Sequence, residues 1–181
     1  MDFIEGLPRS GGKDVILVVV DRLTKYSHFI ALSRPFIVSV VAVAYLEYVF
    51  KLHGNPSTII SDRIPTFTIK FWQELFQLQG VSLHLSSAYH PQSDGQTEVV
   101  NRCVEGYLRC IAGQLPHSWS KWLALAEFWY NTNYHSRLEM TPFQALYGIP
   151  LSLQIPYFSG DSPFAAVDQF LRERKDMLKV L

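Results

Sequence analysis

The alternation of hydrophobic and polar residues predicts strands near the start of the chain. Six consecutive apolar residues at 15–20 are mostly β-branched, which is typical of a strand buried on both faces. Apolar segments at 2–7 and 27–33 predict further strands before and after it, and the polar residues 21–26 predict a turn. The first part of the chain therefore predicts a β-meander.

The pattern becomes helical after the third predicted strand. Residues 38–53 predict a helix that ends at Gly54, because glycine is common just past the last turn of a helix. Residues 58–61 and 82–86 predict short strands, and a helix is expected between them at about 68–80. Strands and helices therefore alternate through the middle of the chain.

The clearest helical pattern follows a polar loop at residues 87–93. Apolar residues recur there with helical spacing at Val100, Cys103, Val104, Tyr107, Leu108 and Ile111. Ser93 and Gln96 have the spacing of a capping box at the start of this helix. Further helices are predicted at about 118–134 and from Pro142 to Gly148.

The order of these elements predicts an α/β fold with a mixed five-stranded sheet flanked by helices. Residues 1–150 are expected to form one domain. Residues 151–181 are expected to contain an irregular segment and a charged C-terminal helix, the start of a truncated downstream region.

Composition and charge narrow the possible classes of protein. Hydrophobic residues make up 48% of the chain and charged residues 18%, which excludes a disordered chain. The 16 basic and 16 acidic residues cancel, so a nucleic-acid role must depend on a local basic patch. No apolar run reaches the roughly 18 residues of a membrane span, and no membrane partner is expected.

The two cysteines, Cys103 and Cys110, are seven residues apart on one predicted helix. The helical rise between them is about 10 Å, which is too long for a disulfide. Both cysteines are therefore expected to be free thiols.

Three acidic residues lie at the ends of predicted elements. Asp2 is on the first strand, Asp62 follows the strand at 58–61, and Glu98 lies in the first turns of the long helix. Ligands of α/β sheets gather at the carboxyl ends of strands, and clustered carboxylates attract hard cations such as Mg²⁺. Because the chain has 16 acidic residues, solvated element ends are the simpler explanation of the three positions until the flanking residues are considered.

The residues around these acids resemble the catalytic core of retroviral-type integrases, specifically that of gypsy-type LTR retrotransposon polyproteins. The matching segments are MDFIEGLP (1–8), VDRLTK (20–25), SDR (61–63), SAYHPQSDGQTE (87–98), NR (101–102), WYNTN (129–133) and TPFQALYG (141–148). They occur in the family's order and cover about residues 1–150. Asp62 and Glu98 are separated by the 35 residues 63–97, a spacing that belongs to the same motif.

The resemblance implies an RNase H-like fold and a DNA integration activity. It assigns Asp2, Asp62 and Glu98 as catalytic residues that hold two Mg²⁺ or Mn²⁺ ions, which would direct attack on a phosphodiester. The implied partners are the DNA ends of the element and a target duplex, and the implied location is the nucleus. Asp21 is a rival for the first acid, but its place after the second strand favours a role in the turn.

The same resemblance and the helix pattern give candidate nucleic-acid contacts. Tyr89 and Gln92 lie in the loop that borders the active site in the family, and Asn101 belongs to the motif after Glu98. Arg102 and Arg109 share the helix face of Glu98, opposite the apolar stripe, where they would contact phosphates or form ordinary surface ion pairs.

Two further interpretations concern assembly and activity. Tyr107, Trp119, Trp122 and Trp129 are either core residues or a surface for self-association, and the resemblance implies a homo-oligomer. Ile64 stands where the gypsy-type pattern has aspartate, and the family's upstream zinc domain is absent from this sequence. An inactive fragment that binds nucleic acid or dimerises is therefore the alternative to an active enzyme. A ribonuclease H-type hydrolase fits the 87–98 motif less well.

Overall fold

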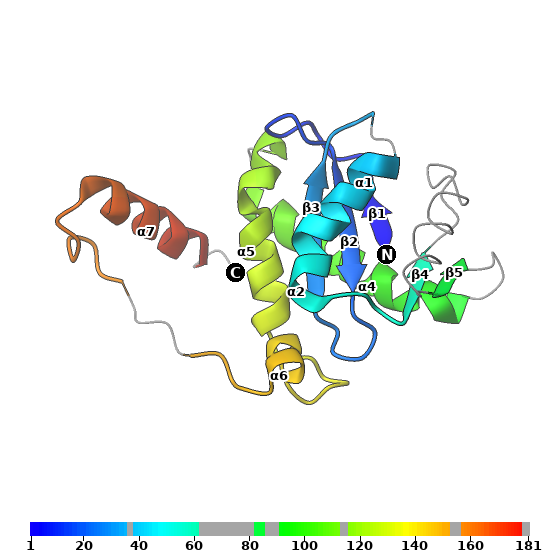
Figure 1. Ribbon diagram of the computed structural model, residues 1–181. Helices are drawn as coiled ribbons and strands as arrows, with labels where there is room; N and C mark the ends of the chain where they lie inside the picture. Colours follow the sequence, from blue (N-terminus) through cyan, green and yellow to red (C-terminus); the bar gives the residue numbers. More distant parts are fainter. Residues whose placement is uncertain (36–37, 62–81, 86–90, 113–115, 153–156, 179–181) are drawn as a thin grey trace.

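The computed structural model describes residues 1–35, 38–61, 82–85, 91–112, 116–152 and 157–178. Its central sheet is an antiparallel meander of β1 (Asp2–Ile4), β2 (Val15–Val20) and β3 (Ser27–Leu32), in the order β1-β2-β3 (Figure 1). Asp2 pairs with Val18, and Val15 pairs with Leu32. The predicted meander is confirmed, although β1 ends at Ile4 and not at residue 7.

A second pair of strands lies beside β1. β4 (Thr58–Ser61) and β5 (Ser82–Leu85) are parallel and form their own two-stranded sheet. The amino group of Met1 donates a hydrogen bond to the carbonyl oxygen of Ile60 at 2.7 Å, which holds the start of β1 against β4. A single five-stranded sheet is not confirmed, because the strand ladders divide into a group of three and a group of two.

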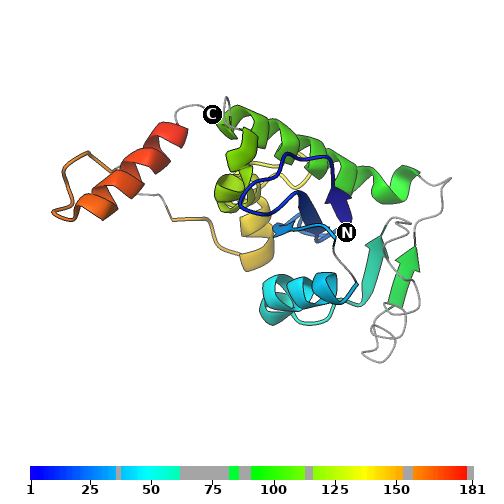
Figure 2. The same cartoon turned by 90° about the horizontal axis from the view of Figure 1, so that it is seen from above.

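Helices cover both faces of the central sheet (Figures 1 and 2). One face packs against a continuous helical segment made of α1 (Val38–Tyr45), the π-helical turn η1 (Leu46–Phe50) and α2 (Lys51–His53). The other face packs against α4 (Pro91–Ala112) and α5 (Trp119–Thr132). Since side chains alternate along a strand, Val15 and Leu17 contact the first layer, while Ile16 and Val18 contact the second.

The apolar stripe of α4 is buried as predicted, with one exception. Val100, Val104, Tyr107, Leu108 and Ile111 are all at most 7% exposed. Cys103, which the periodicity placed in this stripe, is exposed, because it lies at the edge of the stripe on the helical wheel. Cys110 is also an exposed free thiol, so the expectation of two unpaired cysteines is confirmed.

The bulky aromatics of the later helices belong to the core. Tyr107 and Trp119 are 4% and 2% exposed, and the indole nitrogen of Trp119 donates to the carbonyl oxygen of Pro8 at 2.6 Å. Trp122 and Trp129 are partly buried against the same core. The core interpretation is therefore correct for Tyr107 and Trp119, and a role of the partly buried Trp122 and Trp129 in self-association stays a prediction.

Short helical elements precede and follow α5. The 3-10 turn η2 (Pro116–Ser118) precedes α5, and α6 (Pro142–Tyr147) follows it. Thr141 and Gln144 form a complete capping box at the start of α6, and Gly148 ends the helix with a φ of 72°. The predicted start and stop of this helix are both confirmed.

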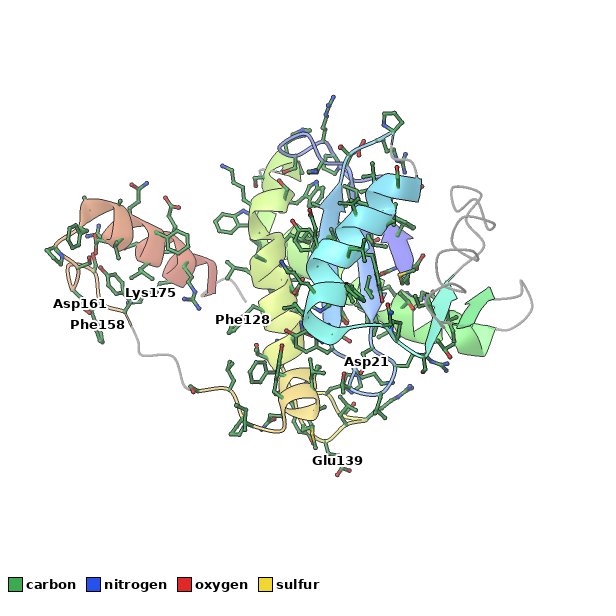
Figure 3. All side chains as sticks on the ribbon, in the orientation of Figure 1. Asp21, Phe128, Glu139, Phe158, Asp161 and Lys175 are labelled. Atoms are coloured by element: carbon green, nitrogen blue, oxygen red, sulfur yellow. The ribbon has the colours of Figure 1, made fainter. Side chains whose placement is uncertain are left out.

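The last helix, α7 (Ala165–Leu178), stands apart from the sheet layers (Figure 1). Its contacts are local: the Tyr157 hydroxyl donates to Asp168 at 2.6 Å, and Lys175 donates to the Tyr157 carbonyl oxygen at 3.1 Å. Figure 3 shows Phe158, Asp161 and Lys175 together on this side of the molecule. No helix in the described part of the chain is long and apolar enough to cross a membrane.

Candidate active site

Asp2 faces α4 because of its position in β1. It lies two residues before Ile4, which packs in the layer of α4 and α5, so both side chains project from the same face of the strand. Its Oδ2 accepts a hydrogen bond from Nδ2 of Asn101 on α4 at 2.7 Å, and its Oδ1 accepts one from the backbone N–H of Phe3 at 2.8 Å. The Asp2 carboxylate is therefore held on the α4 side of β1.

Glu98 lies one helical turn before Asn101 on α4. Its side chain is exposed and is ion-paired with Arg102 across one turn of the helix. The prediction that Glu98 points away from the core is confirmed. Since Asn101 is bonded to Asp2, the turn that carries Glu98 adjoins the strand that carries Asp2.

Asp62 lies outside the described residues, but the strand that leads to it is described. Ile60, two residues earlier, accepts the hydrogen bond from the amino group of Met1. The carboxyl end of β4 is therefore next to the start of β1. Among the residues that the structure describes, no group of three His, Cys, Asp or Glu side chains is arranged to hold a metal ion. The triad of Asp2, Asp62 and Glu98 stays a prediction.

The chemistry of the described residues fits a hard divalent cation. Asp2 and Glu98 offer carboxylate oxygens, which are the ligands that Mg²⁺ prefers. Oδ1 of Asn101 is a buried acceptor with no hydrogen-bond partner among the described residues. Such an acceptor would suit a water molecule of a hydrated ion, because a buried polar atom is costly when it is left unpaired.

Asp21, the rival acid, is used by its own turn. Its Oδ2 accepts hydrogen bonds from the backbone N–H and the hydroxyl of Thr24, and its Oδ1 accepts one from the backbone N–H of Leu23. Burial raises the pKa of Asp21, but these hydrogen bonds and nearby Lys25 outweigh burial, so its pKa lies below the usual value. The interpretation of Asp21 as a turn residue is confirmed.

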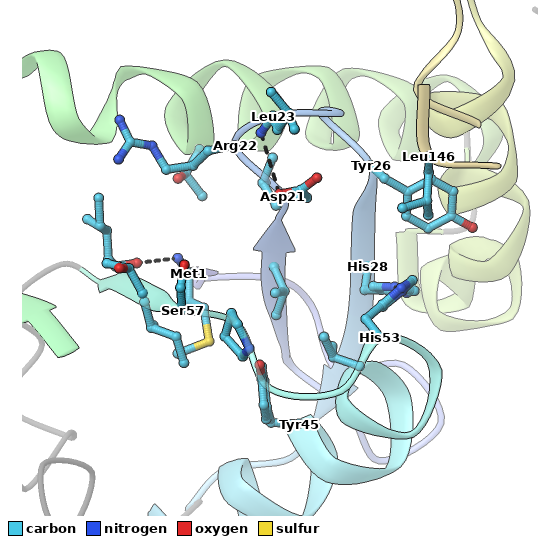
Figure 4. A pocket seen from close by; sticks show the side chains of 18 of the residues that line it. Met1, Asp21, Arg22, Leu23, Tyr26, His28, Tyr45, His53, Ser57 and Leu146 are labelled. Carbon is cyan, nitrogen blue, oxygen red and sulfur yellow. Dashed lines mark hydrogen bonds between the residues drawn. The ribbon is translucent and has the colours of Figure 1, made fainter. Parts of the chain in front are cut away.

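A pocket of about 530 Å³ joins this turn to the start of β1 (Figure 4). Met1, Ile60 and Thr97 line one side, next to the residues that lead to the predicted triad. His28 and His53 line the opposite side. The pocket is therefore lined by the sequence neighbours of Asp2 and Glu98, Met1 and Thr97.

The two arginines of α4 that were predicted to contact nucleic acid each lie beside a glutamate. Arg102 is paired with Glu98, and Arg109 lies 3.8 Å from a carboxylate oxygen of Glu105. Tyr89 lies outside the described residues, as does the side chain of Gln92. Nucleic-acid contacts by these four residues and by Asn101 stay predictions.

A cluster of titratable side chains was not predicted from the sequence. Nε2 of His28 lies 2.8 Å from Nε2 of His53, and Nδ1 of His28 lies 3.1 Å from Oε1 of Glu127 on α5. The other oxygen of Glu127 accepts from the backbone N–H of Phe29 at 2.8 Å. The two histidines are 25 residues apart on different elements, so no local spacing could have indicated their contact.

Comparisons with known proteins relate the chain to transposon polyproteins and integrases. No family model matches the chain. It is 36% identical over 162 residues to the transposon Tf2-3 and Tf2-4 polyproteins of Schizosaccharomyces pombe. The match covers 88% of this chain but only 12% of each polyprotein, so the chain spans a small part of these relatives.

Solved integrase structures share the fold at low sequence identity. An intasome of simian T-cell lymphotropic virus, in complex with a PP2A regulatory subunit, matches with a TM-score of 0.68, 18% identity and coverage of 90% of this chain and 58% of that one. The HTLV-2 integrase catalytic core with magnesium matches with a TM-score of 0.62 and 16% identity, and the match covers 80% of this chain and 93% of that one. The BIV integrase core matches with a TM-score of 0.59 and 20% identity, and the match covers 79% of this chain and 91% of that one. The chain is thus homologous to the Tf2 polyproteins and has the mixed α/β fold of retroviral integrase catalytic cores.

Proposed function

We propose that this chain is the catalytic core of a gypsy-type LTR retrotransposon integrase, and that it joins the 3′ ends of element DNA to target DNA. The observation that carries the proposal is the hydrogen bond between Asp2 and Asn101, which brings the first predicted acid to the helix of the third. The homology to transposon polyproteins and the integrase fold both support it.

Asp2, Asp62 and Glu98 would hold two Mg²⁺ or Mn²⁺ ions. When bound, such ions neutralise phosphate charge and favour attack by an oxygen nucleophile. In this proposal Asn101 keeps the Asp2 carboxylate oriented toward α4, and Arg102 steadies Glu98 until DNA enters. The residues of the chain therefore contribute mainly by positioning and by charge.

The proposed substrates are two DNA molecules. Water is the nucleophile when the element ends are trimmed, and a DNA 3′-hydroxyl is the nucleophile in strand transfer. In each case the attacking oxygen forms a new bond to phosphorus, and the 3′-oxygen of the broken phosphodiester leaves. The place of action that this function implies is the nucleus.

The proposal is tested by a joining assay with labelled element ends, a supercoiled target plasmid and either Mn²⁺ or Mg²⁺. The wild-type chain should join the two DNA molecules, and Asp62→Asn should abolish joining. Glu173→Gln, which removes one negative charge from α7, is the matched control and should keep wild-type activity. A folded wild-type chain that binds DNA but never joins or nicks it would favour the inactive nucleic-acid-binding fragment.

Self-association is part of this proposal. The HTLV-2 integrase core has been solved in dimeric and trimeric forms. In this chain the outer face of α1 and the turns after it exposes Val40, Val43, Tyr48 and Leu52, each between 44% and 58% exposed. Apolar groups that remain in water favour association, so this face is the proposed contact between copies.

A further inference from the structure

The turn between β2 and β3 presents two cations on a rigid backbone. Arg22 and Lys25 follow Asp21, whose carboxylate accepts the hydrogen bonds from Leu23 and Thr24 that close the turn. Nζ of Lys25 donates to the carbonyl oxygen of Arg22, which ties the two basic residues together. Lys25 has a φ of 62°, in the left-handed region that few non-glycine residues adopt.

A third cation comes from the segment between α5 and α6. The backbone N–H and C=O of Ser27, at the end of the turn, both bond to the side chain of buried Asn131 near the end of α5, at 2.8 Å each. This contact places the following segment, with Arg137, at the same end of the molecule as the turn. Figure 3 shows Asp21 of the turn and Glu139 of that segment at this end.

Arg22 and Arg137 both lie within electrostatic range of Lys25. Burial lowers the pKa of Lys25, and the positive charges of Arg22 and Arg137 lower it further, while Asp21 opposes them. Arg22 and Arg137 are exposed, and no ion pair neutralises either of them within the described ranges. This differs from Arg102 and Arg109 on α4, which both have glutamate partners.

The basic cluster adjoins the candidate active site. Arg22 lines the same pocket as Met1, Ile60 and Thr97, which lie beside the predicted triad. In Figure 4 the Arg22 side chain extends on the side of Met1 and away from Leu146 of α6. Arg22 therefore borders the pocket on the side of Met1, while Lys25 and Arg137 continue the positive charge beyond the pocket lining.

We propose that Arg22, Lys25 and Arg137 form a phosphate-binding surface that holds duplex DNA beside the active site. The proposal deepens the proposed function and rests on it for the choice of DNA as the partner. The chain has no net charge, so this local excess of positive charge is what a polyanion would recognise. The acidic groups nearby are Asp21, which the turn already uses, and Glu139.

The test measures binding of a fluorescein-labelled duplex by fluorescence anisotropy at several salt concentrations, with Ca²⁺ present to prevent cleavage. The variant Arg22→Ala/Arg137→Ala should bind at least about tenfold more weakly at low salt. The slope of log K against log salt should fall by about 1.8, because each lost phosphate contact removes about 0.9. Arg9→Ala, which removes an exposed cation from the loop after β1, is the control and should bind like wild type.

A joining assay on the same proteins separates this inference from the proposed function. Suppose that the double variant binds DNA more weakly and with a smaller salt slope, while the wild type binds DNA but does not join it. The phosphate-binding surface is then supported and the proposed joining reaction is wrong. If the wild type joins DNA and the double variant keeps both its affinity and its slope, the surface is wrong and the reaction stands. Failure of the wild type to bind duplex DNA at any salt concentration would also overturn the surface. Circular dichroism of the variants confirms that they are folded.

Discussion

The side-chain amide of Asn101 on α4 holds the carboxylate of Asp2 on β1, with Nδ2 donating to Oδ2 at 2.7 Å. The amide cannot rotate without losing this bond, so its Oδ1 remains a buried acceptor without a partner in the described part of the chain. A side chain that orients a metal ligand in this way acts on the site through that ligand.

Loss of this amide should impair the site more than the fold. Asn101→Ala is expected to lower joining activity and apparent Mn²⁺ affinity by about 10- to 100-fold, the usual effect of removing a group that orients a ligand. Titrating Mn²⁺ in the joining assay measures both quantities. Asn133→Ala, at an exposed asparagine after α5, is the control. Equal metal dependence in Asn101→Ala and wild type would show that the amide has no role in the site.

Metal binding should stabilise the fold through the predicted triad. An ion that binds only the native state adds about 2.7 kcal/mol of unfolding free energy at 100 times its Kd. Thermal unfolding with and without Mn²⁺ should therefore show a metal-dependent rise in Tm for wild type and Asp21→Asn, and little rise for Asp62→Asn. If Asp62→Asn kept the metal-dependent rise in Tm and Asp21→Asn lost it, Asp21 and not Asp62 would be the metal ligand.

The contact between His28 and His53 should make stability fall in mild acid. Burial and neighbouring His28 lower the pKa of His53, while Asp21 raises it, and the result lies below the usual 6.5. Glu127 bonds to His28, and the ring of Tyr26 packs on both histidines and on Tyr147.

Below the unfolded pKa of about 6.5 the unfolded chain binds protons at His53 more readily than the folded chain does. The free energy of unfolding is therefore at its full value above this pH and decreases as the pH falls below it. Urea unfolding above and below this pH should show a smaller pH dependence for His53→Gln than for wild type. His117→Gln, at an exposed histidine, is the control. An unchanged pH dependence in His53→Gln would contradict the prediction.

Asn131 should be a major contributor to stability. It is 2% exposed, and its amide pairs with both backbone groups of Ser27, which is fully buried. Asn131→Ala leaves a buried N–H and a buried C=O without partners, at a cost of about 3 kcal/mol in unfolding free energy. Urea denaturation measures this loss, with Asn133→Ala as the exposed control. A loss of unfolding free energy below about 0.5 kcal/mol, the usual limit for surface substitutions, would contradict this role of Asn131.

The exposed apolar face of α1 should mediate self-association. Val43→Glu places a charge among Val40, Tyr48 and Leu52 and should shift the protein toward monomer in sedimentation velocity. Leu23→Glu adds the same charge at an even more exposed apolar residue of the β2–β3 turn and should not change the oligomeric state. A wild-type protein that is monomeric at all concentrations would refute the proposed contact.

The sequence was sufficient for features that depend on neighbouring residues. The apolar run at 15–20, the apolar stripe of the long helix and the segment from Pro142 to Gly148 all predicted elements that the structure contains. These features were accessible because the periodicity of a strand or helix and the geometry of a cap are local. The placement of Glu98 opposite the buried stripe follows from the same local periodicity.

Tertiary structure alone decided which distant residues meet. Asp2 meets Asn101 because β1 packs under α4, and His28 meets His53 because the helical segment that begins with α1 ends beside the start of β3. The division of the strands into groups of three and two was likewise set by pairing between segments far apart in the chain. These contacts could not be read from spacing, because they depend on how whole layers pack and not on the order of neighbouring residues.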